Sequence, residues 1–191
     1  MSATPVQLPD LQFNISGLFK GPLGGRRSYE LRVPVSELDQ LDEGFDVSQP
    51  LEGSVRLLRT NETVLARLRG AMAVQLECGR CLEPFEAELD IAVEEEFHPS
   101  VDVLTGRPFH DTGDDAALVI DKHHILDMSE VVRQAILLEL PLSPVCREDC
   151  AGLCPVCGAN RNFEACTCAQ EATNLRWLGL SALIDLQTDE T

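Results

Sequence analysis

Eight cysteines occur as four close pairs, and their spacing constrains the fold more than any other feature of the sequence. The pairs are Cys78–Cys81, Cys146–Cys150, Cys154–Cys157 and Cys166–Cys168. Two thiolates two residues apart can bind one metal ion when the turn between them is tight. Gly158, directly after Cys157, permits such a turn because glycine adopts positive φ angles without strain. The spacing therefore predicts a zinc-knuckle segment within residues 146–168.

The cysteines can divide into two sets of four. Cys166 and Cys168 follow the knuckle Cys154–Cys157 closely enough to supply the other two corners of a tetrahedron. The second possible set is Cys78, Cys81, Cys146 and Cys150. The sequence leaves open whether this second set binds metal, so we expect one or two zinc ions. Because four thiolates leave no open coordination position, such zinc is structural rather than catalytic.

Two other uses of cysteine fit the sequence less well. A disulfide framework requires an oxidising compartment, and the start MSATPVQLPD shows neither the basic nor the apolar region of a signal peptide. A redox CxxC motif requires a strand–helix context, whereas CGRC (residues 78–81) falls between two strand patterns.

No apolar run approaches the roughly 20 residues of a membrane helix. We therefore expect a cytoplasmic protein without membrane association.

The charge balance limits the classes of partner. Fifteen Lys and Arg residues against 32 Asp and Glu residues give a formal net charge of −17. Such a field repels phosphate backbones, which disfavours broad electrostatic binding to nucleic acid. Any RNA contact must come from a local basic patch or through a protein partner.

Alternating apolar residues predict an antiparallel meander. Even positions from Val64 to Leu76 are apolar, and the preceding segment Leu51–Arg59 alternates in the same way. A two-residue turn at Asn61–Glu62 would place Val55 opposite Leu68 and Leu57 opposite Ala66, so that the apolar faces match. After CGRC the alternation continues over Phe85–Val93, which makes CGRC the turn of the longest hairpin.

The remaining elements are shorter. Strands are expected at Phe13–Phe19, Tyr29–Val33 and Ala116–Asp121, with a loop over Phe97–Gly113. Val35–Leu41 fits either a short helix or an irregular connection. Asp127 and Glu130 resemble a capping box that opens a helix ended by Pro141, and a second helix is expected at Thr173–Leu186.

These elements predict an α+β fold. An antiparallel sheet is packed by one or two helices and followed by a C-terminal zinc-knuckle segment. Residues 1–145 would form the core domain with the CGRC hairpin turn. Residues 146–191 would form the cysteine-rich zinc-binding segment and the C-terminal helix.

Four arginines are candidate binding residues. The predicted register places Arg56 opposite Arg67, and like charges directly opposed are unfavourable unless something neutralises them. That partner is either an anion such as RNA phosphate or a carboxylate such as Glu94, and we expect the ion pair because surface ion pairs are common. Arg80 and Arg161 lie beside the cysteines.

Sequence motifs of catalysis are absent. The chain has no phosphate-binding loop, dinucleotide fingerprint, nucleophile elbow or HExxH motif. We therefore expect no enzymatic activity and no small-molecule substrate.

Three segments resemble the YceD-like family, whose members are described as 23S rRNA (large ribosomal subunit) accumulation proteins of bacteria and plastids. They are LECGRCLEPFEAELDIAVEEEF, ALVIDKHHILDMSEVVRQAILLELPLSP and CREDCAGLCPVCGANRNFEACTC. The residues that match best are Cys78, Arg80, Cys81, Leu82, Glu130, Leu140 and Pro141. The cysteine-rich tail is present in only part of the family, and Arg161 stands where similar tails read CGANLN.

The resemblance implies a non-enzymatic role in the synthesis, processing or stability of 23S rRNA. Arg80, Arg161, Arg56 and Arg67 would contact rRNA directly, or the acidic body would bind a basic ribosomal protein or assembly factor. The charge of −17 favours the protein partner. Two alternatives stay open: a zinc-dependent nucleic-acid-processing enzyme, and an acidic zinc-stabilised interaction module unrelated to rRNA.

Overall fold

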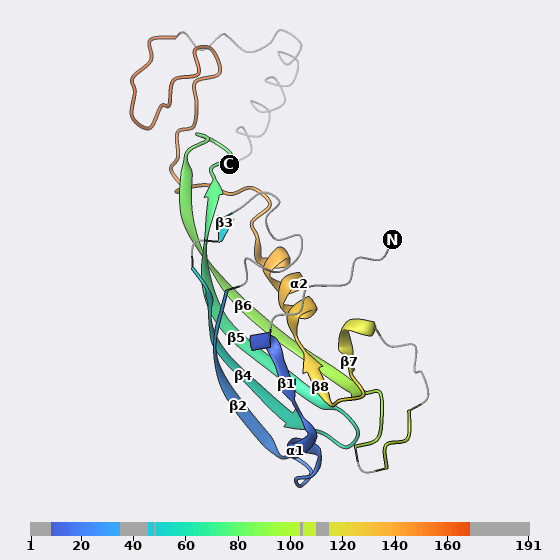
Figure 1. Ribbon diagram of the computed structural model, residues 1–191. Helices are drawn as coiled ribbons and strands as arrows, with labels where there is room; N and C mark the ends of the chain where they lie inside the picture. The colour runs from blue at the N-terminus through green and yellow to red at the C-terminus, as the bar shows by residue number, and fades with distance from the viewer. Residues whose placement is uncertain (1–8, 35–45, 48, 104, 110–114, 169–191) are drawn as a thin grey trace, which may run out of the picture.

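A long hairpin of β5 (Val64–Glu77) and β6 (Pro84–Pro99) forms the spine of the molecule. The computed structural model describes residues 9–34, 46–47, 49–103, 105–109 and 115–168. β4 (Leu51–Arg59) lies beside β5, and β2 (Arg26–Val33) lies beside β4. Figure 1 shows the hairpin extending beyond the helices, with the cysteine-rich segment at its tip.

The predicted register of the central strands is confirmed. Val55 lies opposite Leu68, and Leu57 lies opposite Ala66. All four side chains are buried, because the alternating pattern places them on the same face of the sheet. Gly53 and Gly70 face each other where the two backbones approach closely, and a Cβ atom at Gly53 would collide with the backbone of Arg69.

The inner face of the sheet is covered by a small ribbon and one helix. β1 (Gln12–Asn14) pairs with β8 (Ile125–Asp127) as a separate two-stranded sheet, and α2 (Ser129–Glu139) packs over β6. The largest fully buried side chains include Leu11, Ile15, Leu51, Leu57, Leu68, Ile91, Phe97, Ile120, Leu126, Met128 and Ile136. The predicted α+β class, a sheet packed by helices with a C-terminal cysteine cluster, is confirmed.

Two local predictions were wrong at turns made by side chains. The expected strand Phe13–Phe19 is interrupted after β1, because Asn14 Oδ1 accepts a hydrogen bond from Ser16 N (3.1 Å) and the short helix α1 (Ser16–Phe19) follows. At α2, Asp127 Oδ1 does accept from Ser129 N (2.9 Å). Glu130 does not complete a capping box, since its carboxylate pairs with Arg133 instead.

The segment before β8 also departs from a pure meander. The expected strand Ala116–Asp121 starts as the 3-10 turn η3 (Ala116–Leu118) and continues as β7 (Val119–Ile120), which runs parallel to β6. β6 reaches Pro99, three residues into the expected loop. A further short strand, β3 (Asp46–Val47), pairs with β5, and a 3-10 turn, η1 (Pro9–Leu11), precedes β1. Val35–Leu41 and Thr173–Leu186 lie outside the described residues.

Candidate metal centres

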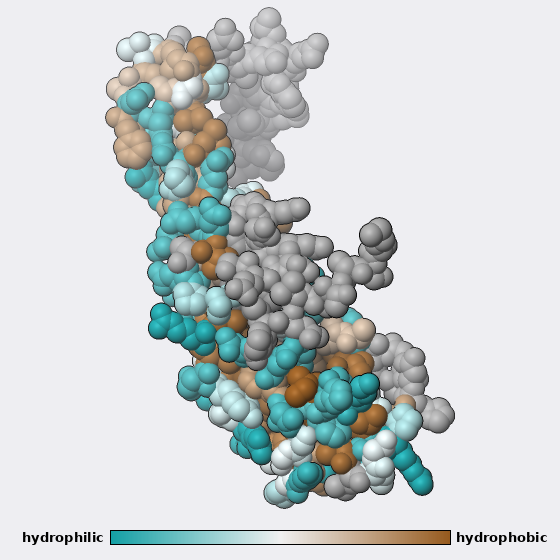
Figure 2. Space-filling view, viewed as in Figure 1, coloured by the Kyte–Doolittle hydropathy of each residue, from teal (hydrophilic) through white to brown (hydrophobic). Residues whose placement is uncertain are grey.

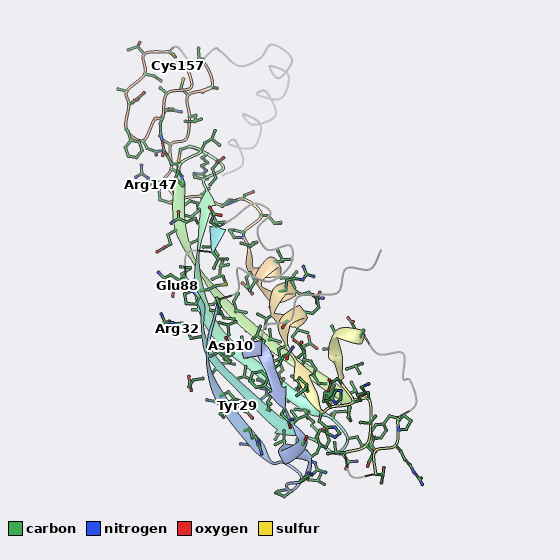
Figure 3. The ribbon with its side chains drawn as sticks, viewed as in Figure 1. Asp10, Tyr29, Arg32, Glu88, Arg147 and Cys157 are labelled. Carbon is green, nitrogen blue, oxygen red and sulfur yellow. The ribbon has the colours of Figure 1, made fainter. Side chains whose placement is uncertain are left out.

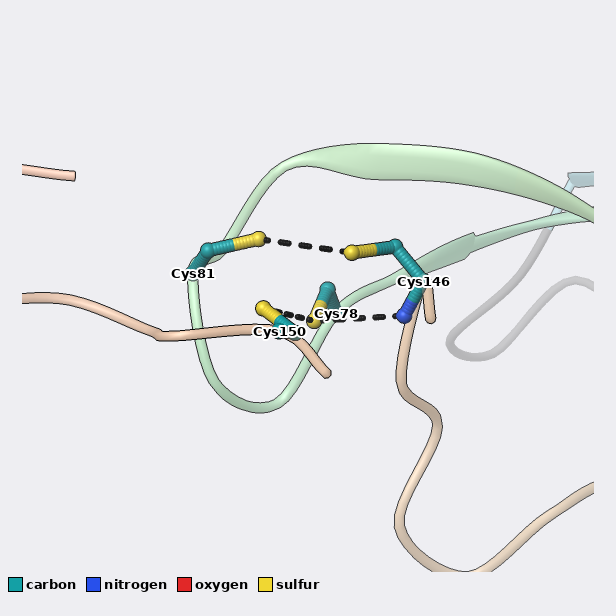
Figure 4. Close-up of side chains that lie close together, drawn as sticks. All are labelled: Cys78, Cys81, Cys146 and Cys150. Carbon is teal, nitrogen blue, oxygen red and sulfur yellow. Dashed lines mark hydrogen bonds between the residues drawn. The ribbon is translucent and has the colours of Figure 1, made fainter. Parts of the chain in front are cut away.

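Four thiols lie together where residues 141–168, which we call the tail, contact the tip of the long hairpin. We call Cys78, Cys81, Cys146 and Cys150 the hairpin cluster; their sulfur atoms all lie within 4.8 Å of one another. Figure 4 shows Cys78 and Cys81 on the hairpin turn facing Cys146 and Cys150 on the tail. Three of the four are buried, and Phe85 and Val145 pack against them.

The spacing of the sulfur atoms fits a tetrahedral metal site. Cys78 Sγ lies 3.9 Å from Cys150 Sγ, and Cys81 Sγ lies 3.8 Å from Cys146 Sγ. A zinc–sulfur bond of about 2.3 Å gives a tetrahedron whose edge is about 3.8 Å. A disulfide would instead require sulfur atoms about 2.05 Å apart, and all eight cysteines are free thiols. The hairpin cluster therefore could hold a metal ion without rearrangement.

The other four thiols form a second group of the same kind. We call Cys154, Cys157, Cys166 and Cys168 the C-terminal cluster; their sulfur atoms also lie within 4.8 Å of one another. This cluster is more exposed, since Cys157 is exposed and only Cys154 is buried. Figure 3 shows Arg147 beside the hairpin tip and Cys157 farther out along the cysteine-rich segment. In the part of the chain that the structure describes, no further group of His, Cys, Asp or Glu converges in this way.

Both CxxC turns are built alike. Leu82 N donates to Cys78 O (2.8 Å), and Gly158 N donates to Cys154 O (2.9 Å). The residue after the second cysteine has positive φ in each turn, 59° at Leu82 and 75° at Gly158. The sequence indicated this geometry at Gly158 but not at Leu82, since leucine rarely adopts it.

Arg80 forms hydrogen bonds that join the tail to the hairpin turn. Its Nη1 donates to the carbonyl oxygens of Glu148 (3.0 Å) and Cys150 (3.2 Å), and its own carbonyl accepts from Leu153 N (2.9 Å). Gly152 lies against it with φ +69°, and a Cβ atom there would lie 3.0 Å from Arg80 O. The Arg80 guanidinium, expected from the sequence to bind a partner, thus contacts the tail of its own chain.

Hydrogen bonds lower the pKa of thiols in both clusters, and Cys150, which accepts from Asn162, is one of them. The pKa of Cys78 is lowered to about 6, mainly because Cys146 N donates to its sulfur (3.4 Å). The pKa of Cys154 is also lowered to about 6, mainly by the backbone N–H of Cys157. Burial raises the pKa of Cys146 to about 12, and a hydrogen bond with Cys157 raises that of Cys168 to about 12. Binding a metal to four thiolates must therefore release protons.

The four arginines expected to bind do not form one surface. Arg56 and Arg67 lie opposite each other on the outer face of the sheet, as predicted, and Arg67 Nη2 contacts Glu94 Oε1 at 2.7 Å. Arg80 and Arg161 lie at the hairpin tip, at the other end of β5. Among the described residues, neither Arg56 nor Arg161 has an ion-pair partner.

The order of these features along the chain matches one protein family. The family model described as "Large ribosomal RNA subunit accumulation protein YceD" matches residues 67–184, which include most of the hairpin, α2 and all eight cysteines. The chain belongs to the YceD family. The resemblance inferred from the three sequence segments is thus confirmed.

Relatives of this chain occur in bacteria and plants. An uncharacterized protein of Mycobacterium tuberculosis (strain ATCC 25618 / H37Rv) is 32% identical over 154 residues, covering 80% of this chain and 69% of its own length. The "Large ribosomal RNA subunit accumulation protein YCED homolog 1, chloroplastic" of Zea mays is 48% identical over 44 residues, 22% of this chain and 15% of its own. The Arabidopsis thaliana protein of the same name is 37% identical over 46 residues, 24% of this chain and 14% of its own. No solved structure matches.

The roles of two residues beside the clusters were not predicted from the sequence. Leu82 holds the positive φ of the CGRC turn, and Asn162 donates to Cys150 Sγ. The position of Leu82 after a CxxC was the available signal, because Gly158 occupies the equivalent position. Nothing in the sequence connects Asn162 to Cys150.

Within the described residues, no helix combines the length and apolar character needed to span a bilayer.

Proposed function

We propose that this protein is a non-enzymatic factor that supports the accumulation of large-subunit (23S) rRNA by binding a basic protein partner at the hairpin tip. The observation that carries the proposal is the pair of four-thiol clusters at the hairpin tip, one of which joins the tail to the hairpin. Each cluster would hold one structural zinc ion, because tetrahedral thiolate sites of this size are typical of zinc. The name of the family supports the link to rRNA. A cytoplasmic location stays a prediction.

A structural role for the metal follows from the ligand count. Four thiolates complete a tetrahedron, so neither cluster would keep a position for a water molecule or a substrate. This disfavours the zinc-dependent nucleic-acid-processing enzyme. Zinc in the hairpin cluster would instead rigidify the tip, because it would join two thiols of the hairpin turn to two thiols of the tail. The division into domains at residues 145 and 146 stays a prediction, although Cys146 lies in the hairpin cluster.

The surface of the tip favours a protein partner. Leu82, Val156 and Phe163 are apolar and yet 55%, 64% and 76% exposed. In Figure 2 apolar residues are visible on the cysteine-rich end of the molecule. Next to the tip, β6 presents the exposed side chains of Glu86 and Glu88. Exposed apolar side chains near an acidic strand are complementary to a basic protein with an apolar anchor.

Direct contact with rRNA is the second version of this function. Arg161 supports it, because its exposed side chain lies at the tip without an ion-pair partner among the described residues. Arg80 supports it less, since its guanidinium already donates to the tail. Arg56 and Arg67 lie far along the sheet and would require a separate contact.

The test is capture of large-subunit components by immobilised, zinc-loaded protein, with and without RNase. We expect a basic ribosomal protein or assembly factor to be retained after RNase treatment. Leu82→Ser/Phe163→Ser should abolish retention, whereas Leu23→Ser should not, because Leu23 is 63% exposed but lies before β2, away from the tip. In cells lacking the gene, wild type but not the double variant should restore the ratio of large- to small-subunit rRNA.

Other outcomes would each favour a different function. Retention that requires RNA, falls steeply with salt and is lost in Arg161→Glu would indicate direct rRNA binding. Cleavage of rRNA by the purified protein, abolished by a chelator and restored by zinc, would indicate an enzyme. An unchanged rRNA ratio in cells lacking the gene would leave an interaction module unrelated to rRNA.

A further inference from the structure

The side chain of Asn162 connects the two thiol clusters. Asn162 lies between Cys157 and Cys166 in the sequence, inside the loop that supplies the C-terminal cluster. Its Nδ2 nevertheless lies 3.4 Å from the Sγ of Cys150, which belongs to the hairpin cluster. Asn162, in the loop between two cysteines of the C-terminal cluster, therefore contacts a sulfur atom of the hairpin cluster.

The orientation of this amide follows from its other contacts. The Oδ1 of Asn162 accepts from Ala151 N (2.9 Å) and from Arg147 Nη2 (2.8 Å). Both groups can only donate, so the atom between them must be the oxygen. The NH2 group then faces Cys150 Sγ and Asn160 Oδ1, the latter at 2.8 Å. The contact with Cys150 is thus an N–H donor directed at sulfur.

An N–H donor stabilises a thiolate in two ways. It offsets part of the negative charge on the sulfur, and it holds the lone pairs in a fixed direction. Cys150 is only 5% exposed, so water has little access to replace a lost donor. Hydrogen bonds of this outer shell typically change metal affinity by about 10- to 100-fold.

We propose that Asn162 couples the two clusters, so that an ion in one raises the affinity of the other. This inference rests on the two zinc sites of the proposed function. An ion bound to the C-terminal cluster closes the loop between Cys157 and Cys166 and so positions the Asn162 amide against Cys150. The hairpin cluster then binds its ion without ordering that loop, and the coupling must act equally in the reverse direction.

The matched substitution is Asn162→Asp. Aspartate has nearly the same shape and keeps the oxygen that accepts from Ala151 and Arg147, but it places an acceptor instead of a donor against Cys150. Asn162→Ala removes both roles. Asn61→Asp adds the same charge at the exposed turn between β4 and β5, at the opposite end of β5 from the clusters, and serves as the control.

The experiment is a competitive Zn²⁺ titration against a chromogenic chelator under reducing conditions. In wild type, Cys154→Ser/Cys157→Ser should weaken the hairpin site by about 5- to 150-fold. In Asn162→Asp and Asn162→Ala the hairpin site should already be about 10- to 100-fold weaker, and the same cysteine changes should have little further effect. Cys78→Ser/Cys81→Ser should weaken the C-terminal site of wild type by the same factor.

A spectroscopic measurement separates positioning from a general loss of structure. With both clusters loaded with Co²⁺, so that the loop between Cys157 and Cys166 is closed, the sulfur-to-cobalt charge-transfer band reports the hydrogen bonds to the ligand thiolates. Losing the hydrogen bond raises the energy of the sulfur lone pairs, so the band should move to longer wavelength in Asn162→Asp and Asn162→Ala. It should not move in Asn61→Asp, and the circular dichroism of the sheet should stay unchanged in all variants.

Four results would overturn the inference. Cysteine changes that weaken the hairpin site equally in wild-type and Asn162→Asp backgrounds would show that Asn162 carries no coupling. An unmoved cobalt band would show that the amide does not act on Cys150. Wild type that binds two ions independently would refute the coupling alone, whereas wild type that binds no metal would refute the zinc sites as well.

Discussion

The junction between tail and hairpin depends on a backbone conformation that only glycine adopts easily, so Gly152→Ala should loosen it. Gly152 has φ +69°, and an alanine there would pay about 1–2 kcal/mol for the left-handed region. Its Cβ atom would also lie 3.0 Å from Arg80 O, which accepts the hydrogen bond from Leu153 N. Displacing that oxygen weakens the bond, which adds about 1 kcal/mol. We expect a total loss of about 2–3 kcal/mol.

Two other glycines separate the contact from the conformational cost. Gly24 (φ +76°) and Gly158 (φ +75°) have no atom within 4 Å of an added Cβ, so alanine there should cost only about 1–2 kcal/mol. The assay is urea unfolding followed by circular dichroism, at one fixed zinc concentration for all variants. Zinc release to a chelator should also be faster in Gly152→Ala than in Gly24→Ala. If Gly152→Ala loses no more stability than Gly24→Ala, the tail does not press on Arg80 as described.

Three further changes test other parts of the structure. Cys78→Ser/Cys81→Ser should lower the zinc content from two ions to one by elemental mass spectrometry; one ion in both proteins would show that the hairpin cluster binds none. Leu82→Gly should raise the free energy of unfolding by up to about 1 kcal/mol in urea, because the 55% exposed Leu82 has φ 59° and loses little burial; a loss of stability would mean that the Leu82 side chain packs more than its exposure indicates. The pKa of Glu130 is lowered mainly by its hydrogen bonds from Arg133, so the ionised carboxylate should add less than about 1 kcal/mol to the free energy of unfolding. This contribution is fully present above the pKa of the unfolded state and is lost as the pH falls through the lower pKa of the folded state. The difference in urea midpoint between wild type and Glu130→Gln should therefore disappear at strongly acidic pH, and a difference that persists there would need another cause.

Sequence patterns predicted the parts of the fold that repeat regularly. The alternation from Val64 to Leu76 is unbroken, and a shift of one residue would expose the whole apolar face, so the pairing of Val55 with Leu68 could be derived. The alternating pattern of the expected strand Phe13–Phe19 is much shorter. The strand ends at Asn14, whose Oδ1 accepts from Ser16 N, and α1 follows. The parallel pairing of β6 with β7 depends on a partner about 20 residues away, which local patterns do not reveal.

The candidate metal sites were also only partly predictable from the sequence. Cysteine spacing placed Cys154, Cys157, Cys166 and Cys168 in one set and left the other four as a possible second set, and the structure groups the sulfur atoms in those two sets. Whether they bind zinc stays a prediction. The contacts of Arg80 lie 68 and 70 residues away in the sequence, so its role in holding the tail could not be derived from its neighbours.

The tip of the hairpin extends beyond the other strands of the sheet on the β5 side. β4 pairs with β5 only over Val64–Ala71, and β3 pairs only with Val74 and Gln75. Within the described residues, the last pairs of the hairpin, Leu76 with Phe85 and Glu77 with Pro84, therefore have no third strand beside them on the β5 side. An isolated two-stranded ribbon is marginally stable in water. Four thiols that bind one ion across the turn and the tail would replace the missing strand, which makes the position of the hairpin cluster a consequence of where the sheet ends.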